Sequence, residues 1–171
     1  QVIMNELDDI RREYGKSRKT VIENVAEAVY VEKKIEEMDI VFLMDRFGYA
    51  RSVDVPTYER NKEAADSENK YVVFCKNTGQ ICIFTNTGQL HTVKLQDVPF
   101  GKFRDKGVPI DNISNYDSQK EYAITVESQT SLNLYRILFV TAQAMMKIVD
   151  GGEFDVAKRT VAATKLQDND E

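Results

Sequence analysis

The 171-residue sequence contains no apolar run long enough to cross a bilayer. Its longest uncharged apolar stretches, such as Tyr71 to Cys75 and Ile137 to Ala142, are far shorter than the ~20 residues that a membrane-spanning helix needs. Residues Gln1 to Glu6 contain neither a basic leader nor an apolar core, so no secretion signal is expected. The sequence therefore predicts a soluble protein.

Cysteine and histidine are scarce. Cys75 and Cys82 lack the second pair of cysteines that a zinc site requires. We expect both to lie in strands, and we expect the protein to occupy the reducing cytoplasm. His91, the only histidine, has no cysteine or carboxylate nearby at ligand spacing, which favours a structural role. Gly151-Gly152 lacks the Lys and Ser or Thr that complete a phosphate-binding loop. Because the carboxylates are also scattered, we predict no catalytic residue, no metal site and no cofactor in this chain.

The sequence also lacks a basic half. Residues 1–38 hold 7 basic and 9 acidic side chains, and residues 39–171 hold 16 and 19, which together give the net charge of −5. This balance argues mildly against tight nucleic-acid binding, because affinity for the phosphate backbone comes from Lys and Arg. A local basic patch could still bind.

Apolar residues at helical spacing predict a short helix over Gln1–Tyr14, closed by Gly15. No N-cap precedes it, so we expect it to be the tail of a longer helix. Residues 21–38 mix β-branched and charged residues and are interpreted as a linker with some strand character.

The residue pattern of 39–171 is typical of a mainly β protein. Short β-branched and aromatic runs predict strands at Ile40–Leu43, Tyr71–Phe74, Ile81–Phe84, Tyr122–Val126 and Ile137–Val140. Asn77 to Gly79 and Asn86 to Gly88 predict hairpin turns, because Gly and Asn accept positive φ. Their spacing indicates a meander.

An internal repeat is the most informative feature. An apolar strand ending in Phe, a polar turn and a second strand with a basic residue occur at Phe42 to Arg51, Phe84 to Lys94 and Phe139 to Lys147. Gly48, Gly88 and Ala144 take equivalent places, 40 and then 56 residues apart. Such periods are typical of four-stranded blades in a propeller-like array. Because the third unit is followed by Glu171 before another blade could form, we expect an unfinished array.

Four segments in order resemble the A subunits of the bacterial type IIA DNA topoisomerases, DNA gyrase and topoisomerase IV. Glu6 to Gly15, followed by Arg18-Lys19-Thr20, is similar to the end of the family's coiled-coil region. Asp39 to Tyr58, with Gly48-Tyr49-Ala50-Arg51, is similar to the first blade of its C-terminal domain. Lys106 to Asn112 resembles the Lys-Gly-x-Pro-Ile-x-Asn loop of the second repeat, and Phe154 to Leu166 resembles the third.

The resemblance implies the end of a helical coiled-coil region at 1–20, a linker at 21–38 and a partial C-terminal β-pinwheel at 39–171, with two to three propeller-like blades. It implies a DNA-binding and DNA-bending segment without catalysis of its own, within an ATP-hydrolysing topoisomerase. In the family the DNA-cleaving tyrosine follows an arginine in an upstream domain, and ATP binds the partner subunit. Implied partners are double-stranded DNA, the rest of the A subunit with its dimer mate, and the ATPase B subunit. The implied location is cytoplasmic, at the nucleoid, without membrane contact.

Basic residues on the repeat strands and loops are the candidate DNA-contacting rim. The candidates are Arg51, Arg60, Lys62, Lys94, Lys102, Arg104, Lys106, Lys147, Lys158, Arg159 and Lys165. Rim contacts of this kind position and bend a duplex without reading bases. For each residue alone, an ordinary solvated surface position is an equally good interpretation.

Gyrases of this family carry a Gln-Arg-Arg-Gly-Gly-(Lys/Arg)-Gly box after the first-blade tyrosine. The stretch after Tyr58 reads Asn61-Lys62-Glu63-Ala64-Ala65-Asp66-Ser67. Glu63 and Asp66 replace expected cations, and only Lys62 and the nearby Arg60 keep a positive charge. The resemblance therefore implies a parent enzyme closer to topoisomerase IV, with a plain solvated loop at this place as the simpler interpretation.

Two other functions stay open at this stage. One is a protein-interaction propeller that the acidic balance keeps off DNA; the other, weaker one is a free-standing enzyme. A partial disc should also leave strand edges unpaired, so we expect self-association or an edge covered by Val21 to Met38.

Overall fold

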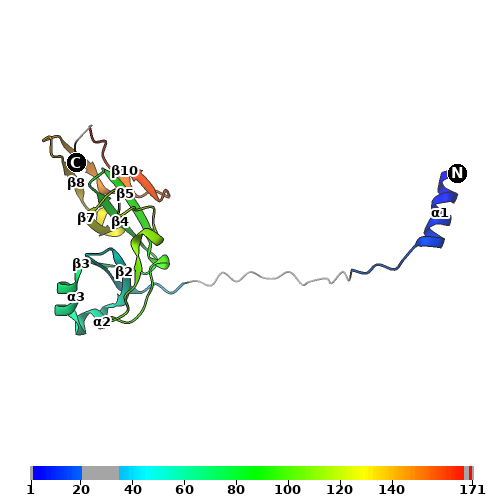
Figure 1. Cartoon of the computed structure of the whole chain (residues 1–171), viewed down its shortest axis with the longest axis horizontal. Coiled ribbons are helices and arrows are strands. Elements are labelled where there is room, and N and C mark those ends of the chain that lie inside the picture. Colours follow the sequence, from blue (N-terminus) through cyan, green and yellow to red (C-terminus); the bar gives the residue numbers. More distant parts are fainter. Residues whose placement is uncertain (1, 21–34, 168–169, 171) are drawn as a thin grey trace. The chain divides into compact units, whose positions relative to one another are not determined.

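The computed structural model describes residues 2–20, 35–167 and 170. The chain divides into two units, Gln1–Lys34 and Ile35–Glu171, and every strand among the described residues lies in the second (Figure 1). The first unit contains α1 (Val2–Tyr14), which confirms the predicted helix. It ends where the Gly15 N–H donates to the Arg11 carbonyl oxygen at 2.9 Å. Of the predicted linker, residues 21–34 lie outside the described residues.

The described residues of the second unit form three antiparallel sheets. Sheet 1 has the order β3 (Asn69–Lys76), β1 (Asp39–Asp45), β2 (Tyr49–Asp54), β6 (Val108–Pro109). Sheet 2 has the order β10 (Thr160–Ala162), β5 (Gln89–Lys94), β4 (Gln80–Thr85), β7 (Ala123–Ser128). Sheet 3 is the hairpin β8 (Arg136–Val140) and β9 (Met146–Asp150). The short helices are α2 (Val55–Arg60), α3 (Lys62–Glu68), α4 (Gln129–Leu132), η1 (Leu95–Asp97), η2 (Ile110–Asn112) and η3 (Gly151–Phe154).

In each four-stranded sheet, the last strand comes from the part of the chain that follows the next hairpin. We call it the borrowed strand. β6 comes after β5 but pairs with β2, and β10 comes after β9 but pairs with β5. After each borrowed strand, a backbone N–H donates to the hairpin-turn glycine: Ile110 to the Gly48 oxygen at 2.8 Å, and Ala163 to the Gly88 oxygen at 2.9 Å. These exchanged strands tie neighbouring sheets together.

The predicted equivalence of Gly48, Gly88 and Ala144 is confirmed. All three have positive φ, at 81°, 72° and 61°, and each N–H donates to the carbonyl oxygen three residues earlier. The predicted hairpin at Asn77 to Gly79 is wrong. The chain does turn there, with the Gly79 N–H bound to the Lys76 oxygen at 2.8 Å, but β3 pairs with β1 while β4 pairs with β5 and β7. A local turn motif does not say whether the flanking strands pair.

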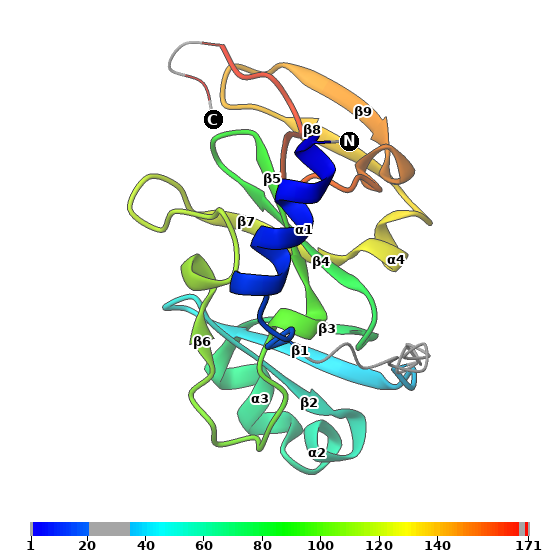
Figure 2. The ribbon, with the colours of Figure 1, turned by 90° about the vertical axis from the view of Figure 1, so that its right-hand side faces the viewer.

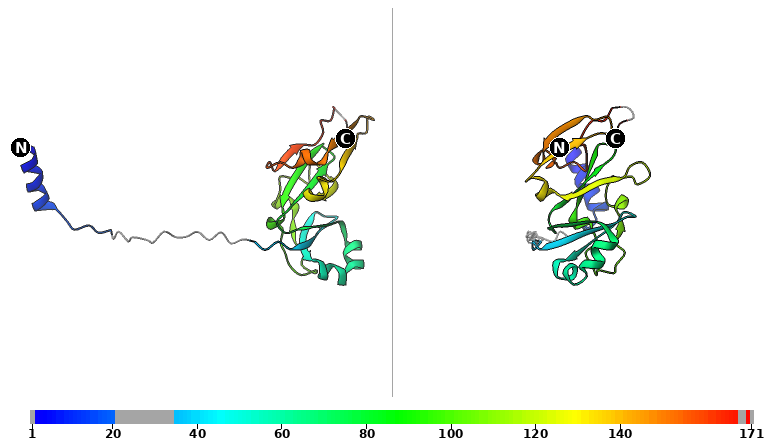
Figure 3. Two further views of the ribbon diagram at one scale, coloured as in Figure 1. Left: turned by 180° about the vertical axis from the view of Figure 1, so that it is seen from behind. Right: turned by 90° about the vertical axis from the view of Figure 1, so that its left-hand side faces the viewer.

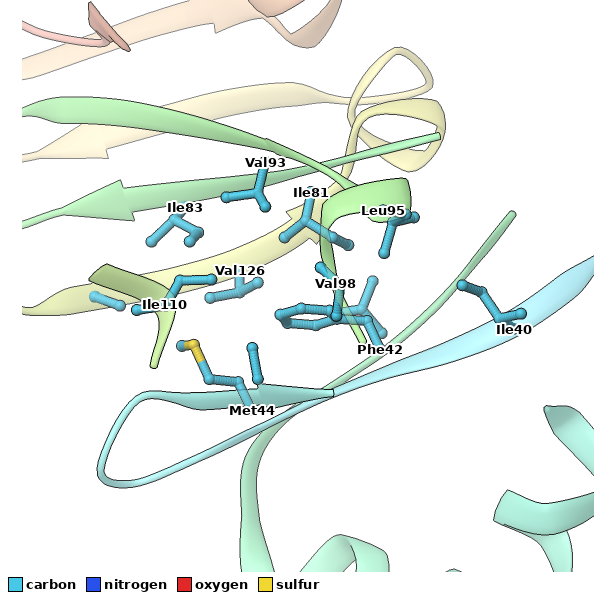
Figure 4. Close-up of a cluster of buried hydrophobic side chains, with 13 residues drawn as sticks. Ile40, Phe42, Met44, Ile81, Ile83, Val93, Leu95, Val98, Ile110 and Val126 are labelled. Carbon is cyan, nitrogen blue, oxygen red and sulfur yellow. The ribbon is translucent and has the colours of Figure 1, made fainter. Parts of the chain in front are cut away.

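The sheets are stacked face to face in the order 3, 2, 1, with α2 and α3 beyond sheet 1 (Figures 2 and 3). Between sheets 1 and 2, Phe42 and Met44 face Ile81, Ile83 and Val126 (Figure 4). Between sheets 2 and 3, three aromatic rings meet: the Phe84 centroid lies 5.9 Å from Phe139 and 5.4 Å from Phe154. Burial of these apolar faces is the main force that holds the stack together.

Two helices, which the sequence interpretation missed, cover the remaining face of sheet 1. α2 starts at Asp54, whose carboxylate accepts the Thr57 N–H at 3.1 Å, a standard N-cap contact. Tyr58 of α2 and Ala65 of α3 are buried against apolar side chains of β1 and β2. The simpler interpretation of 61–67 as a solvated loop is therefore wrong, because α3 occupies Lys62–Glu68.

Among the described residues, no helix or strand covers the outer face of sheet 3 in this way. Leu138, Val140, Met146 and Ile148 share the face that points away from sheet 2 and are 56–70% exposed. In the described part of the chain, no third strand pairs with β8 or β9. No helix among the described residues is long and apolar enough to span a membrane.

Candidate nucleic-acid interface

The segment Pro99–Gly107, called here the basic loop, runs beside β2 before the chain enters β6. It carries three cations, Lys102, Arg104 and Lys106, against one anion, Asp105. All three cations are exposed, and none forms an ion pair among the described residues. This makes the loop a compact positive surface.

The backbone of the basic loop is bonded to β2. The Ser52 N–H donates to the Pro99 oxygen at 2.8 Å, and the Gly101 N–H donates to the Ser52 oxygen at 3.1 Å. Within the loop, the Lys102 N–H donates to the Asp105 carboxylate at 2.8 Å. Gly107 has a φ of +78°, and a Cβ there would lie 2.3 Å from the Ala50 oxygen. Glycine is therefore required for the loop to approach the strand so closely.

Two cation–aromatic pairs also join the loop to β2. The Arg51 guanidinium lies 5.6 Å from the centroid of the Phe103 ring, and the Lys106 ammonium lies 4.4 Å from the centroid of Tyr49. Each distance is within the range in which a cation is attracted to a ring face.

A second basic group lies on the corresponding part of sheet 2. The Thr92 N–H donates to the Arg159 oxygen at 2.9 Å, and the Thr92 hydroxyl donates to the Lys158 oxygen at 3.0 Å. Lys94 and Arg159 line one small pocket. The pairing of β10 with β5 can be aligned with the pairing of β6 with β2. In this alignment Arg159 corresponds to Lys106 of the basic loop. Cations thus recur just before each borrowed strand.

The other candidates are spread over the unit. Lys147 and Lys165 line one groove beside sheet 3. The Arg60 side chain bonds within α2, to the Pro56 oxygen at 3.1 Å and the Thr57 hydroxyl at 3.2 Å, and Lys62 is exposed on α3. The region of these last two is acidic, since Val55–Glu68 holds four carboxylates and two cations.

The structure revises two of the candidates. Arg51 is only 8% exposed, no described carboxylate pairs with it, and its Nε has no hydrogen-bond partner there. Lys94 is not the counterpart of Arg51, because the registers align Arg51 with His91 and Lys147. Lys94 instead aligns with Asp54 and Asp150, at the far end of the strand.

His91 does have a carboxylate partner, contrary to the expectation from local spacing. Its Nε2 lies 2.8 Å from Glu121 Oε1, and its Nδ1 lies 3.1 Å from the Thr160 hydroxyl. Glu121 is 30 residues further along the chain, so ligand spacing did not reveal it. The pair is buried and holds strands together.

The two thiols lie in strands, as predicted. Burial raises the pKa of Cys75 to about 11 and that of Cys82 to about 12, so both are thiols at neutral pH. Among residues 2–20, 35–167 and 170, no three His, Cys, Asp or Glu side chains gather where a metal ion could bind.

The aromatic partners of the basic loop were missed at the sequence level. Phe103 lies between Lys102 and Arg104, and Tyr49 lies next to the turn glycine. The alternation of basic and aromatic residues at 102–104 is the signal that could have identified this loop.

Comparison with known proteins gives consistent results. No protein-family model matches the chain. The chain is 25% identical to the A subunit of DNA gyrase from Clostridium acetobutylicum, covering 99% of this chain and 22% of that protein. It is 28% identical to the gyrase A subunit from Neisseria gonorrhoeae, covering 99% and 20%. The chain thus spans about a fifth of the length of the curated relatives that it matches.

Solved structures show the same fold. The C-terminal domain of DNA topoisomerase IV superposes with a TM-score of 0.67 at 19% identity, covering 80% of this chain and 45% of that one. The C-terminal domain of E. coli ParC gives 0.60 at 14% identity, covering 78% and 54%.

The exchanged-strand stack is therefore a partial β-pinwheel of two to three blades, preceded by a short helix, as predicted. The chain is similar in sequence to the A subunits of DNA gyrase and in fold to the C-terminal domain of DNA topoisomerase IV, which confirms the resemblance recognised in the sequence.

Proposed function

We propose that this chain is a non-catalytic DNA-binding and DNA-bending segment of the A subunit of an ATP-dependent type IIA topoisomerase. The main support for the proposal is the basic loop. Its cations are exposed, and its backbone is hydrogen-bonded to β2. A recurring cation at Lys106 and Arg159 gives the surface a repeat that a duplex could follow from one blade to the next. The similar proteins are a DNA gyrase A subunit and a C-terminal domain of DNA topoisomerase IV, which supports the same function.

The net charge of −5 does not by itself oppose this proposal, because the basic loop carries a local excess of positive charge. The basic loop has three cations and one anion, whereas Val55–Glu68 has two cations and four anions. Phosphates interact with local charge over about one Debye length, ~10 Å at 0.1 M salt. Lys102, Arg104 and Lys106 are therefore the cations that a duplex on the basic loop meets first.

The test is a titration of labelled duplex DNA with the protein, followed by fluorescence anisotropy at several salt concentrations. We expect affinity to fall with salt, and the Lys102→Gln and Arg104→Gln variants each to reduce the log–log slope by about 0.9. Lys120→Gln is the matched control, because Lys120 already pairs with Asp117 at 2.7 Å. Binding that is absent at low salt would refute the proposal.

We further propose that the parent enzyme acts like topoisomerase IV rather than a supercoiling gyrase. At the place of the gyrase box, α3 buries Ala65, and Asp66 accepts the Tyr58 hydroxyl at 2.8 Å. A helix with buried side chains lacks the backbone freedom of a glycine-rich loop. Glu63 and Asp66 also repel phosphate, so wrapping at this site should be weak.

A plasmid topology assay tests the second proposal. The full-length protein with its ATPase partner should relax or decatenate DNA without introducing negative supercoils. Negative supercoiling of relaxed plasmid would refute it, and would leave DNA binding by the basic loop untouched.

The proposed partners are double-stranded DNA, the rest of the A subunit with its dimer mate, and the ATPase B subunit. No cofactor is proposed for this chain. The rival function, a protein-interaction module that stays off DNA, is favoured by the acidic helices α2 and α3 alone. The salt titration separates the two, because only a DNA binder loses affinity steeply with salt.

A further inference from the structure

The side chain of Arg51 is an unusual member of the candidate rim. It is 8% exposed, while Lys102, Arg104 and Lys106 around it are all exposed. A duplex is a wide, rigid rod, so its phosphates reach exposed groups far more readily than a buried guanidinium. The position of Arg51 therefore calls for a role other than phosphate contact.

The contacts of β2 with the basic loop are reciprocal. Tyr49 and Arg51, two residues apart on one face of the strand, present a ring and a cation. Phe103 and Lys106 lie three residues apart in the loop. The Phe103 ring pairs with the Arg51 cation, and the Lys106 cation pairs with the Tyr49 ring. Because each strand residue meets a different loop residue, the two pairs restrain the loop at two points.

Phe103 connects this contact to the hydrophobic core. It packs against the cluster of Val41, Leu43, Val53, Tyr58 and Ala65 on the outer face of sheet 1. Its ring therefore contacts both these apolar side chains and the Arg51 guanidinium, which lies over the ring. The backbone of Lys102 and Arg104, on either side of Phe103 in sequence, is held close to sheet 1 as a result.

The second repeat has an anchoring residue at the same position. The strand registers align Arg51 opposite Leu43 with His91 opposite Ile83. His91 is also buried, and it ties β5 to Glu121 and to Thr160 in the segment that carries Lys158 and Arg159. In both repeats this position joins the strand to a loop with exposed cations nearby.

We propose that Arg51 and Phe103 are positioning residues that preorganise the basic loop for duplex DNA, and that Arg51 itself does not contact phosphate. This inference rests on the proposed DNA binding. Restraint of the loop before binding reduces the conformational entropy lost when DNA binds, and so raises affinity without adding a contact.

The experiment compares variants by DNA affinity, by salt slope and by amide hydrogen exchange of the free protein. Arg51→Met removes the charge but keeps an unbranched stem over Phe103. We expect it to leave the salt slope unchanged, whereas Lys102→Gln lowers the slope by about 0.9. Phe103→Ala keeps every cation, yet it should weaken DNA binding severalfold and speed exchange at the Gly101 and Lys102 amides.

Two outcomes would overturn the inference. One is a slope reduced by Arg51→Met as much as by Lys102→Gln, which would make Arg51 a phosphate contact. The other is a Phe103→Ala protein with unchanged affinity and unchanged exchange. Arg51→Gln and Phe103→Leu serve as second variants if either first choice fails to fold by circular dichroism. Wild-type protein without salt-dependent binding would instead refute the proposed function, and the inference with it.

Discussion

His91 Nε2 lies 2.8 Å from Glu121 Oε1, and both side chains are almost fully buried. The carboxylate of Glu121 also accepts the Thr87 hydroxyl at 3.0 Å and the Asp117 N–H at 3.2 Å. His91 in turn reaches Thr160 on the borrowed strand β10. One hydrogen-bonded network, centred on this buried pair, thus joins β5, the β4–β5 turn, the segment before β7 and a strand from the third repeat.

Replacing this carboxylate should destabilise the fold. We expect Glu121→Gln to lower the free energy of unfolding by about 1.5–3 kcal/mol at neutral pH, because hydrogen bonds to a buried charged group are lost or weakened. Denaturant unfolding measures the change. Glu153→Gln, at an exposed carboxylate of η3, is the control and should have little effect. Equal stability of the Glu121→Gln and wild-type proteins would show that the network is not a structural link.

The same residue predicts a pH dependence. Burial by itself raises the pKa of Glu121, but hydrogen bonds from Thr85, the Asp117 N–H and Thr87, together with the charge of His91, lower it overall. Since the folded-state pKa lies below the unfolded-state pKa, the stabilisation is present above the unfolded-state value and is lost as pH falls through the folded-state value. The stability difference between wild type and Glu121→Gln should therefore shrink below about pH 4.5. A difference that stays constant down to pH 3 would contradict this assignment.

Ala144 occupies a left-handed conformation that favours glycine. Its φ of 61° matches the 81° of Gly48 and the 72° of Gly88. Left-handed backbone costs an L-residue roughly 1–2 kcal/mol, so Ala144→Gly should raise the free energy of unfolding by about 0.5–1 kcal/mol.

The reverse changes at the equivalent glycines form a graded control. At Gly48 the nearest atom to an added Cβ is 3.6 Å away, so Gly48→Ala should cost only the backbone strain. At Gly88 a Cβ would lie 2.6 Å from the Thr164 oxygen, so Gly88→Ala should cost more. Thermal unfolding that ranked the two glycine variants in the opposite order would contradict the argument from these Cβ contacts.

The open face of sheet 3 should drive self-association of this chain by itself. Leu138 and Ile148 are cross-strand partners on that face, and both are more than half exposed. Exposed apolar patches and unpaired edges recruit other chains. Sedimentation at ~100 µM should show dimers or larger species, a range in which exposed apolar surface associates. The Leu138→Lys, Ile148→Glu double variant should be monomeric, whereas Gln96→Lys should behave as wild type; a monomeric wild-type protein would contradict the prediction.

Local features of the sequence determined much of this fold. Turn glycines at Gly48 and Gly88, apolar runs such as Ile81–Phe84, and the threefold repeat predicted the hairpins, because backbone conformation at a turn and alternation along a strand depend on neighbouring residues. The motifs around Lys106 and Lys158 also contain cations that the structure places at the surface. DNA contact by those residues stays a prediction.

Tertiary structure alone decided the rest. Which strands pair around Asn77, why Arg51 is buried on Phe103, and why His91 meets Glu121 all depend on contacts between residues 30 or more apart in the chain or on the choice of partner sheet. The helices α2 and α3 form where sheet 1 offers an apolar face to Tyr58 and Ala65. Short helices gain most of their stability from such packing and little from intrinsic propensity, so the segment looks like a loop until the sheet beneath it is known.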